Sequence, residues 1–138
     1  MDQLTRAQCQ HSLDLLVGQE REIADAFFPL LFERAPELKA MFPKGIDDPM
    51  VQTHTLYQMI IAFVGDEQAL ATKLQVLGFR MAMRGMYRDH ADILVNTLIG
   101  SLKRQLKQSW QSDFAYAWRI AKMEALRDIE AGAVLMAA

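Results

Sequence analysis

The sequence contains a single cysteine, Cys9, among 138 residues. One cysteine excludes an intrachain disulfide framework and fits a reducing cytoplasm. No run of apolar residues approaches the roughly 18–20 that span a bilayer. The polar start Met1-Asp2-Gln3 lacks the apolar stretch of a signal peptide. We therefore expect a cytoplasmic protein with no membrane partner.

The sequence also lacks a charge excess of either sign. Fifteen Lys and Arg residues face 17 Asp and Glu residues, so the formal net charge is −2. This balance gives no electrostatic reason to expect a nucleic-acid partner. There is no glycine-rich phosphate loop, no metal-binding histidine pair, and no Cys-His or Ser-His signature. We therefore expect no enzymatic activity.

No segment shows the sustained alternation of a β-strand, and glycines and prolines fall between helical patterns. We expect one all-α domain, residues 1–138, with six long helices and a short one. The expected elements are a helix capped by Thr5 and ended by Gly18, a helix from about Glu20 to Arg34 with Pro29 inside it, a short turn between Pro36 and Pro43, and helices from Asp48-Pro49 to Gly65, from Asp66 to Gly85, from about Arg88 to Leu106 and from Ser112 onward.

Apolar residues recur at three- and four-residue steps along these helices, as they do on the buried face of a helix. The predicted core stripes are Cys9, Leu13, Leu16 and Val17; Ile23, Phe27, Leu30 and Leu31; Gln52, Leu56, Met59, Ile60 and Phe63; Leu70, Leu74, Leu77 and Met81; Leu94, Leu98, Leu102 and Leu106; and Phe114, Trp118, Ala121 and Ala125.

Three segments together resemble bacterial single-domain globins and flavohaemoglobins. The segment 27–42 carries the pattern Phe-x4-Phe-x3-Pro-x5-Phe of the second and third globin helices. The segment 77–86 resembles the proximal motif Leu-Gly-x-Arg-His-x-x-x-Gly-Val, and 110–118 resembles the start of the final helix. The resemblance implies a globin fold around an apolar slot. By resemblance, the slot is lined by Phe28, Phe42, Gln52, Leu56, Ile60, Leu77, Met81 and Leu98, with Ile93 beside them.

The sequence departs from this family at the residue that binds haem iron. Arg80 and Gly85 fix the register, so the motif's histidine falls on Met81. An inward methionine either fills the core, which we favour, or offers iron a thioether ligand. The other departures are Phe28, which replaces a tyrosine that donates to bound oxygen, and Ala91, which replaces a tyrosine near the proximal ligand.

The three histidines offer no replacement ligand. His11 lies far from any ligand position of the family, and His54 is two residues beyond the distal position, about 200° around the helix. His90 lies near a histidine that the family often has but that does not bind iron. We interpret all three as surface or capping histidines. Arg80 and Arg84 either meet haem propionates or are solvated charges, and we favour the second interpretation.

Two functional hypotheses follow. The first is a haem-free globin-like module that binds a small apolar molecule, such as a fatty acid, or signals to another protein. It is similar to the non-haem globin domains of bacterial stress regulators, and a homodimer through the last two helices is compatible with it. The second is an atypical haem protein. In that case Met81, or no protein ligand, would face the iron of haem b, and the protein would bind oxygen, nitric oxide or carbon monoxide, or move electrons.

Overall fold

The computed structural model describes residues 1–64 and 67–137, with the backbone alone at 62–64, 67–70, 136 and 137. These residues form helices without any strand, as predicted. The helices are α1 (Gln3–Asp14), α2 (Glu20–Arg34), the 3₁₀ helix η1 (Pro36–Met41), α3 (Pro49–Val64), α4 (Glu67–Met83), α5 (Arg88–Leu106), the short 3₁₀ helix η2 (Lys107–Ser109) and α6 (Ser112–Ala137). None of the described helices is long and apolar enough to cross a membrane.

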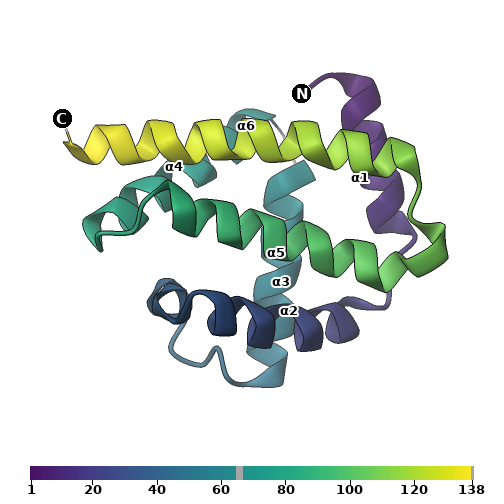
Figure 1. Ribbon diagram of the computed structural model, residues 1–138, viewed down its shortest axis with the longest axis horizontal. Coiled ribbons are helices and arrows are strands. Elements are labelled where there is room, and N and C mark those ends of the chain that lie inside the picture. Colours follow the sequence, from purple (N-terminus) through teal and green to yellow (C-terminus); the bar gives the residue numbers. More distant parts are fainter. Residues whose placement is uncertain (65–66, 138) are drawn as a thin grey trace.

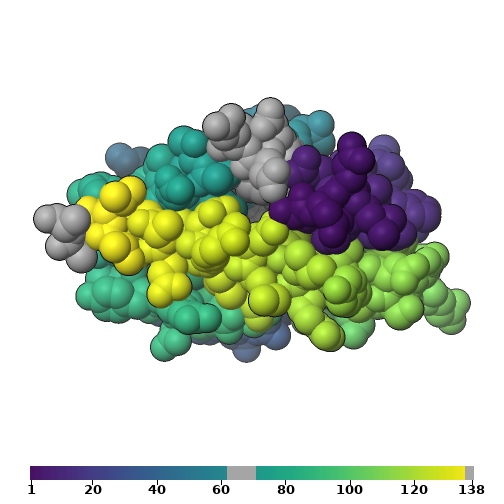
Figure 2. All heavy atoms as spheres, turned by 90° about the horizontal axis from the view of Figure 1, so that it is seen from above, coloured from purple at the N-terminus to yellow at the C-terminus, as the bar shows by residue number. Residues whose placement is uncertain are grey.

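Helices α2, α5 and α6 lie one above another along the long axis, and α3 crosses behind them (Figure 1). Helix α4 packs along the back of α6 in the most extensive helix–helix contact of the described residues. Figure 2 shows α1 beside the first half of α6 on the upper face, in agreement with the contact between these two helices. Residues far apart in the sequence thus meet around α6.

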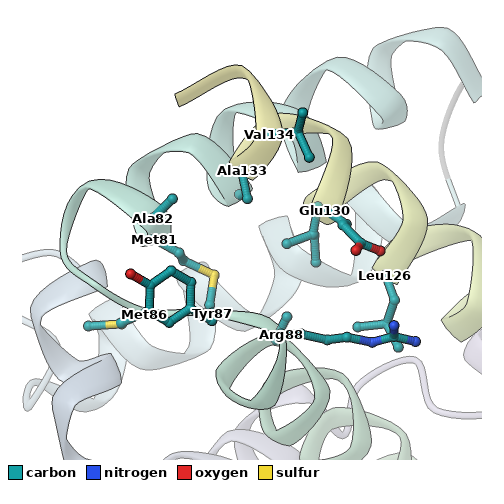
Figure 3. A pocket seen from close by; sticks show the side chains of 12 residues that line it. Met81, Ala82, Met86, Tyr87, Arg88, Leu126, Glu130, Ala133 and Val134 are labelled. Atoms are coloured by element: carbon teal, nitrogen blue, oxygen red, sulfur yellow. The ribbon is translucent and has the colours of Figure 1, made fainter. Parts of the chain in front are cut away.

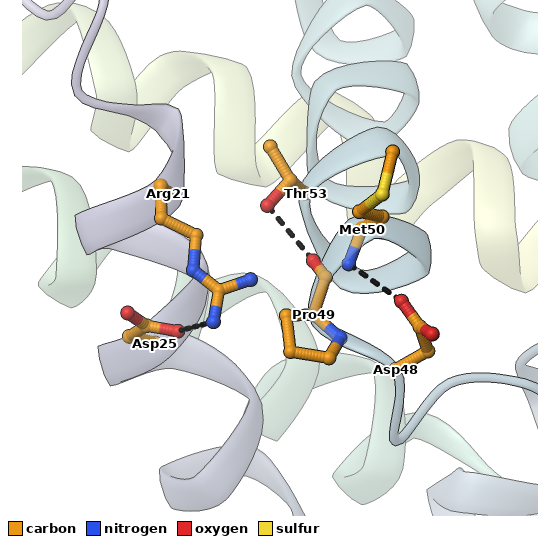
Figure 4. Close-up of polar contacts among 6 residues, drawn as sticks. All are labelled: Arg21, Asp25, Asp48, Pro49, Met50 and Thr53. Atoms are coloured by element: carbon orange, nitrogen blue, oxygen red, sulfur yellow. Dashed lines mark hydrogen bonds and ion pairs between the residues drawn. The ribbon is translucent and has the colours of Figure 1, made fainter.

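Most helix ends lie where the sequence predicts them. The bounds of α2 and α5 and the start of α6 are confirmed. At the start of α3, the Oδ1 atom of Asp48 accepts from the Met50 backbone N–H at 2.8 Å, so Asp48 is the predicted cap (Figure 4). Gly85 has a φ of +73°, and the Met86 N–H donates to the Met81 carbonyl at 2.9 Å. This left-handed glycine ends α4 as predicted.

The predictions for the first helix are wrong at both ends. Asp2, not Thr5, is the cap, because its Oδ1 atom accepts from the Thr5 backbone N–H at 2.7 Å. Regular helix ends at Asp14, and a turn then leads to Gly18, which has a φ of +88°. The turn rotates Val17 into solvent, so its predicted burial is also wrong. The predicted boundaries at Gly65 and Asp66 lie outside the described residues.

The predicted stripes supply most of the core. All four α5 leucines and all four predicted α6 residues are buried, and Leu74 and Met81 are buried on α4. Leu56 is the fully buried member of the α3 stripe, while Gln52, Met59 and Ile60 are half-buried. The side chains of Phe63 and Leu70 lie outside the description. Apolar burial at helical spacing therefore holds the fold together.

Candidate functional site

The eight residues predicted to line a slot mainly fill the core. Phe28, Leu56 and Leu98 are fully buried, Met81 is 2% exposed, and all four belong to one hydrophobic cluster. Phe42, Ile60 and Leu77 pack against that cluster, and the Phe28 and Phe42 rings meet edge to face at 5.5 Å. Gln52 is half-buried. The structure thus brings most of these residues together as packed side chains.

The described residues do not fit haem held in the ordinary way. His11 and His54 are exposed, and the Nε2 atom of His90 lies 2.7 Å from the Oε1 atom of Glu37. Inward thioethers remain at Met81 and Met86, and a thioether is a soft neutral ligand that usually needs a histidine opposite it.

The expectation of surface or capping histidines agrees with these positions. His11 packs its ring edge to face against Phe114 at 5.3 Å. His90 joins α5 to η1 through Glu37, and the pKa of the Glu37 carboxyl is lowered, first by a hydrogen bond from its own backbone N–H and then by the bond with His90. Arg80 and Arg84 are exposed on α4, as expected of solvated charges.

A pocket of about 450 Å³ lies between the end of α4, the start of α5 and the second half of α6 (Figure 3). Of the eight predicted site residues, Met81 is the one that lines it. Ala91, which stands where the resembling family has a tyrosine near the proximal ligand, lines it as well. The other lining residues, which the sequence patterns did not single out as a site, are Gly78, Ala82, Met86, Tyr87, Arg88, Leu126, Ile129, Glu130, Ala133 and Val134. The pocket is mostly apolar, as ligand sites in proteins generally are.

Two glycines set the separation of the helices beside this pocket. A Cβ atom on Gly78 would overlap the backbone carbonyl of Ile129, and one on Gly132 would overlap that of Gln75. The backbones of α4 and α6 therefore touch on both sides of their crossing. Beyond the crossing, Ala82 on α4 and Ala133 on α6 are too small to fill the space between the helices. Small residues thus bring the helices together and also leave the pocket open.

The pocket has charged groups on one side. Figure 3 shows the Arg88 guanidinium and the Glu130 carboxylate on the Leu126 side, with the Tyr87 ring and the Met81 sulfur on the other. Arg88 and Glu130 are exposed and form no ion pair with each other. The site therefore combines an apolar interior with one positive and one negative group. No known protein-family model matches the chain.

Proposed function

We propose that this protein is a globin-fold module that works without histidine-ligated haem and binds a small apolar molecule. One observation carries the proposal. Met81 replaces the ligand histidine of the resembling motif, and its side chain is buried at 2% exposure between a packed core and an apolar pocket. A methionine there offers a guest apolar, polarisable surface in place of an iron bond.

The packing around Met81 supports a haem-free state. Phe28, Leu56 and Leu98 have no exposed surface, so α2, α3 and α5 pack closely where these residues meet the core that contains Met81. Phe28 also has no hydroxyl group that would donate to bound oxygen. A pocket of about 450 Å³ lies between α4, α5 and α6. A guest there is retained by burial of its apolar surface, at about 25 cal/mol per Å².

The visible spectrum tests the haem-free state directly. The purified full chain is titrated with hemin, and the Soret region is followed. We expect a broad, non-saturating rise, such as loosely adsorbed hemin gives. A sharp Soret band that saturates at one hemin per chain would refute the proposal and favour the atypical haem protein, with Met81 or no protein ligand at the iron.

The Met81→His variant tests whether the missing histidine ligand of iron is the only obstacle to haem binding. Because the surrounding core is filled, we expect no stoichiometric hemin binding and a loss of stability of about 1–3 kcal/mol, the cost of burying an imidazole without a hydrogen-bond partner. Met123→His is the matched control, since Met123 is 66% exposed on α6. A saturating Soret band in Met81→His, but not in Met123→His, would show an open slot and contradict the filled core.

A further inference from the structure

The charged side of the α4–α5–α6 pocket indicates which guest it takes. We propose that this pocket binds a flat aromatic molecule carrying both an ammonium and a carboxylate group, as an aromatic amino acid does. This inference rests on the proposed function, because it keeps the same haem-free binding module, and it replaces a purely apolar guest with one that has an apolar ring and a zwitterionic end. It is carried by the coincidence of an apolar interior with two opposite, mutually unpaired charges.

The interior of the pocket suits an aromatic ring. The thioethers of Met81 and Met86 both line it, and Figure 3 shows the Met81 sulfur and the Tyr87 ring on the same side of the pocket. Methionine sulfur makes favourable contacts with aromatic rings, worth about 0.3–1.5 kcal/mol each. Gly78 and Ala133 contribute no bulk on either side. The volume of about 450 Å³ accommodates a two-ring system with its polar substituents.

The charged groups favour a guest with two charges over a guest with one. A carboxylate alone would pair with Arg88 but would also be repelled by Glu130, and an amine alone would meet the reverse arrangement. A zwitterion can pair its carboxylate with Arg88 and its ammonium with Glu130. Each charge of the guest then lies next to an opposite charge of the protein. An uncharged ring would form no ion pair with either residue.

Each of the two charged residues has the chemistry of its assigned role. The planar guanidinium of Arg88 can hold a carboxylate with two parallel hydrogen bonds. Arg88 is the first residue of α5, so the positive end of that helix dipole adds to its attraction for an anion. The Glu130 carboxylate accepts hydrogen bonds from an ammonium group. Both residues are exposed, so their charges are solvated in the free protein and the protein does not have to hold an unpaired charge in its interior before the guest binds.

Four indole compounds separate the parts of this proposal. Tryptophan, tryptamine, indole-3-propionate and indole are titrated into the full chain, and binding is measured by calorimetry and by chemical-shift changes of the Met81 and Met86 methyl groups. We expect tryptophan to bind about tenfold more tightly than each of the other three, a difference of about 1.4 kcal/mol. Failure of all four to bind, or equal affinity of indole and tryptophan, would overturn the proposal.

Variants test the two charges separately. Arg88→Gln is expected to weaken tryptophan and indole-3-propionate about tenfold and to leave tryptamine no weaker. Glu130→Gln is expected to weaken tryptophan and tryptamine and to spare indole-3-propionate. Equal effects of each variant on every compound would contradict the assigned roles. Both positions are exposed, so neither substitution threatens folding.

Filling the pocket tests its location. Ala133→Trp is expected to abolish tryptophan binding, while Ala115→Trp, a half-buried position on the same helix outside this pocket, is expected to retain it. Retention of binding in a folded Ala133→Trp protein would place the guest elsewhere. The outcome of the hemin titration does not depend on the outcome of the tryptophan measurements. Saturating hemin would refute the proposed function alone, and loss of tryptophan selectivity would refute this inference alone.

Discussion

The two halves of α6 are built on opposite packing principles. In the first half, Phe114 and Trp118 are fully buried, and the Trp118 indole Nε1–H donates to the Ser12 hydroxyl at 2.8 Å. That hydroxyl in turn donates to the Cys9 carbonyl at 2.6 Å. In the second half, Gly132 lets the backbone touch α4, and Ala133 faces a pocket. One half of the helix is fixed by bulky side chains with satisfied polar groups, while the other combines backbone contact with open volume.

The largest expected effect is the removal of bulk from the first half. Trp118→Ala leaves a cavity and leaves the Ser12 hydroxyl without its donor, so we expect a loss of about 3–5 kcal/mol in the free energy of unfolding, measured by urea denaturation. Tyr116→Ala on the same helix, where the side chain is 63% exposed, should change stability by less than about 0.5 kcal/mol. Similar losses in the two variants would mean that Trp118 does not organise this half.

Adding bulk should damage the second half. Gly78→Ala and Gly132→Ala each place a methyl group against a backbone carbonyl, and we expect losses of about 1–3 kcal/mol as α4 and α6 separate. Gly100→Ala on α5 is the matched control. Its nearest neighbour to an added Cβ is the Arg104 Nη2 atom at 3.9 Å, so the substitution should stabilise by about 0.5–1 kcal/mol through helix propensity.

Whether each glycine substitution stabilises or destabilises the protein shows whether the backbones of α4 and α6 are in contact. If Gly78→Ala and Gly132→Ala stabilise the protein as Gly100→Ala does, the backbones of α4 and α6 do not meet at this crossing. If they destabilise it and also alter tryptophan affinity, the crossing sets the width of the pocket. Thermal unfolding and calorimetric titration of the same samples give both answers.

The burial of the first half of α6 could be predicted from the sequence for a physical reason. Large apolar residues at three- and four-residue steps, such as Phe114 and Trp118 or Leu94 and Leu98, have no stable place other than a core, so local periodicity predicts their burial. The start of α1 was misread because Asp2 and Thr5 both have capping side chains, and only the backbone geometry shows which one accepts the hydrogen bond.

The pocket could not be predicted in the same way. Its shape depends on Gly78, Ala82 and Ala133, which carry little hydrophobic signal, and on the pairing of α4 with α6, which is a tertiary event. The predicted slot residues share helix faces that point into the core, so the stripes located the core and not the pocket between α4, α5 and α6. Met81 was found because it belongs to both. A repeated small residue on two helices, as at Gly78 and Gly132, was the available signal.

The last expected effect is absent at neutral pH and develops only in alkaline solution, at Cys9 on α1, which packs against the first half of α6. Burial raises the pKa of the Cys9 thiol to about 12, from an ordinary value of 9.0. The unfolded chain therefore loses the thiol proton first, and this contribution to stability, complete below pH 9, is lost as the pH rises towards 12. The expected slope is about 1.4 kcal/mol per pH unit within that window.

Cys9→Ala isolates this contribution from lysines and tyrosines that titrate in the same range. We expect the difference in unfolding free energy between the native chain and Cys9→Ala to change with that slope between pH 9 and pH 12 and to be constant below pH 9. A difference that stays flat throughout would mean that the thiol ionises equally in the folded state, which would require water to reach the Ser12–Trp118 region. If the pH-dependent difference is observed, a thiol reagent should also label Cys9 slowly at pH 8. The buried environment of Cys9 would then exclude the reagent and also disfavour the ionised thiolate.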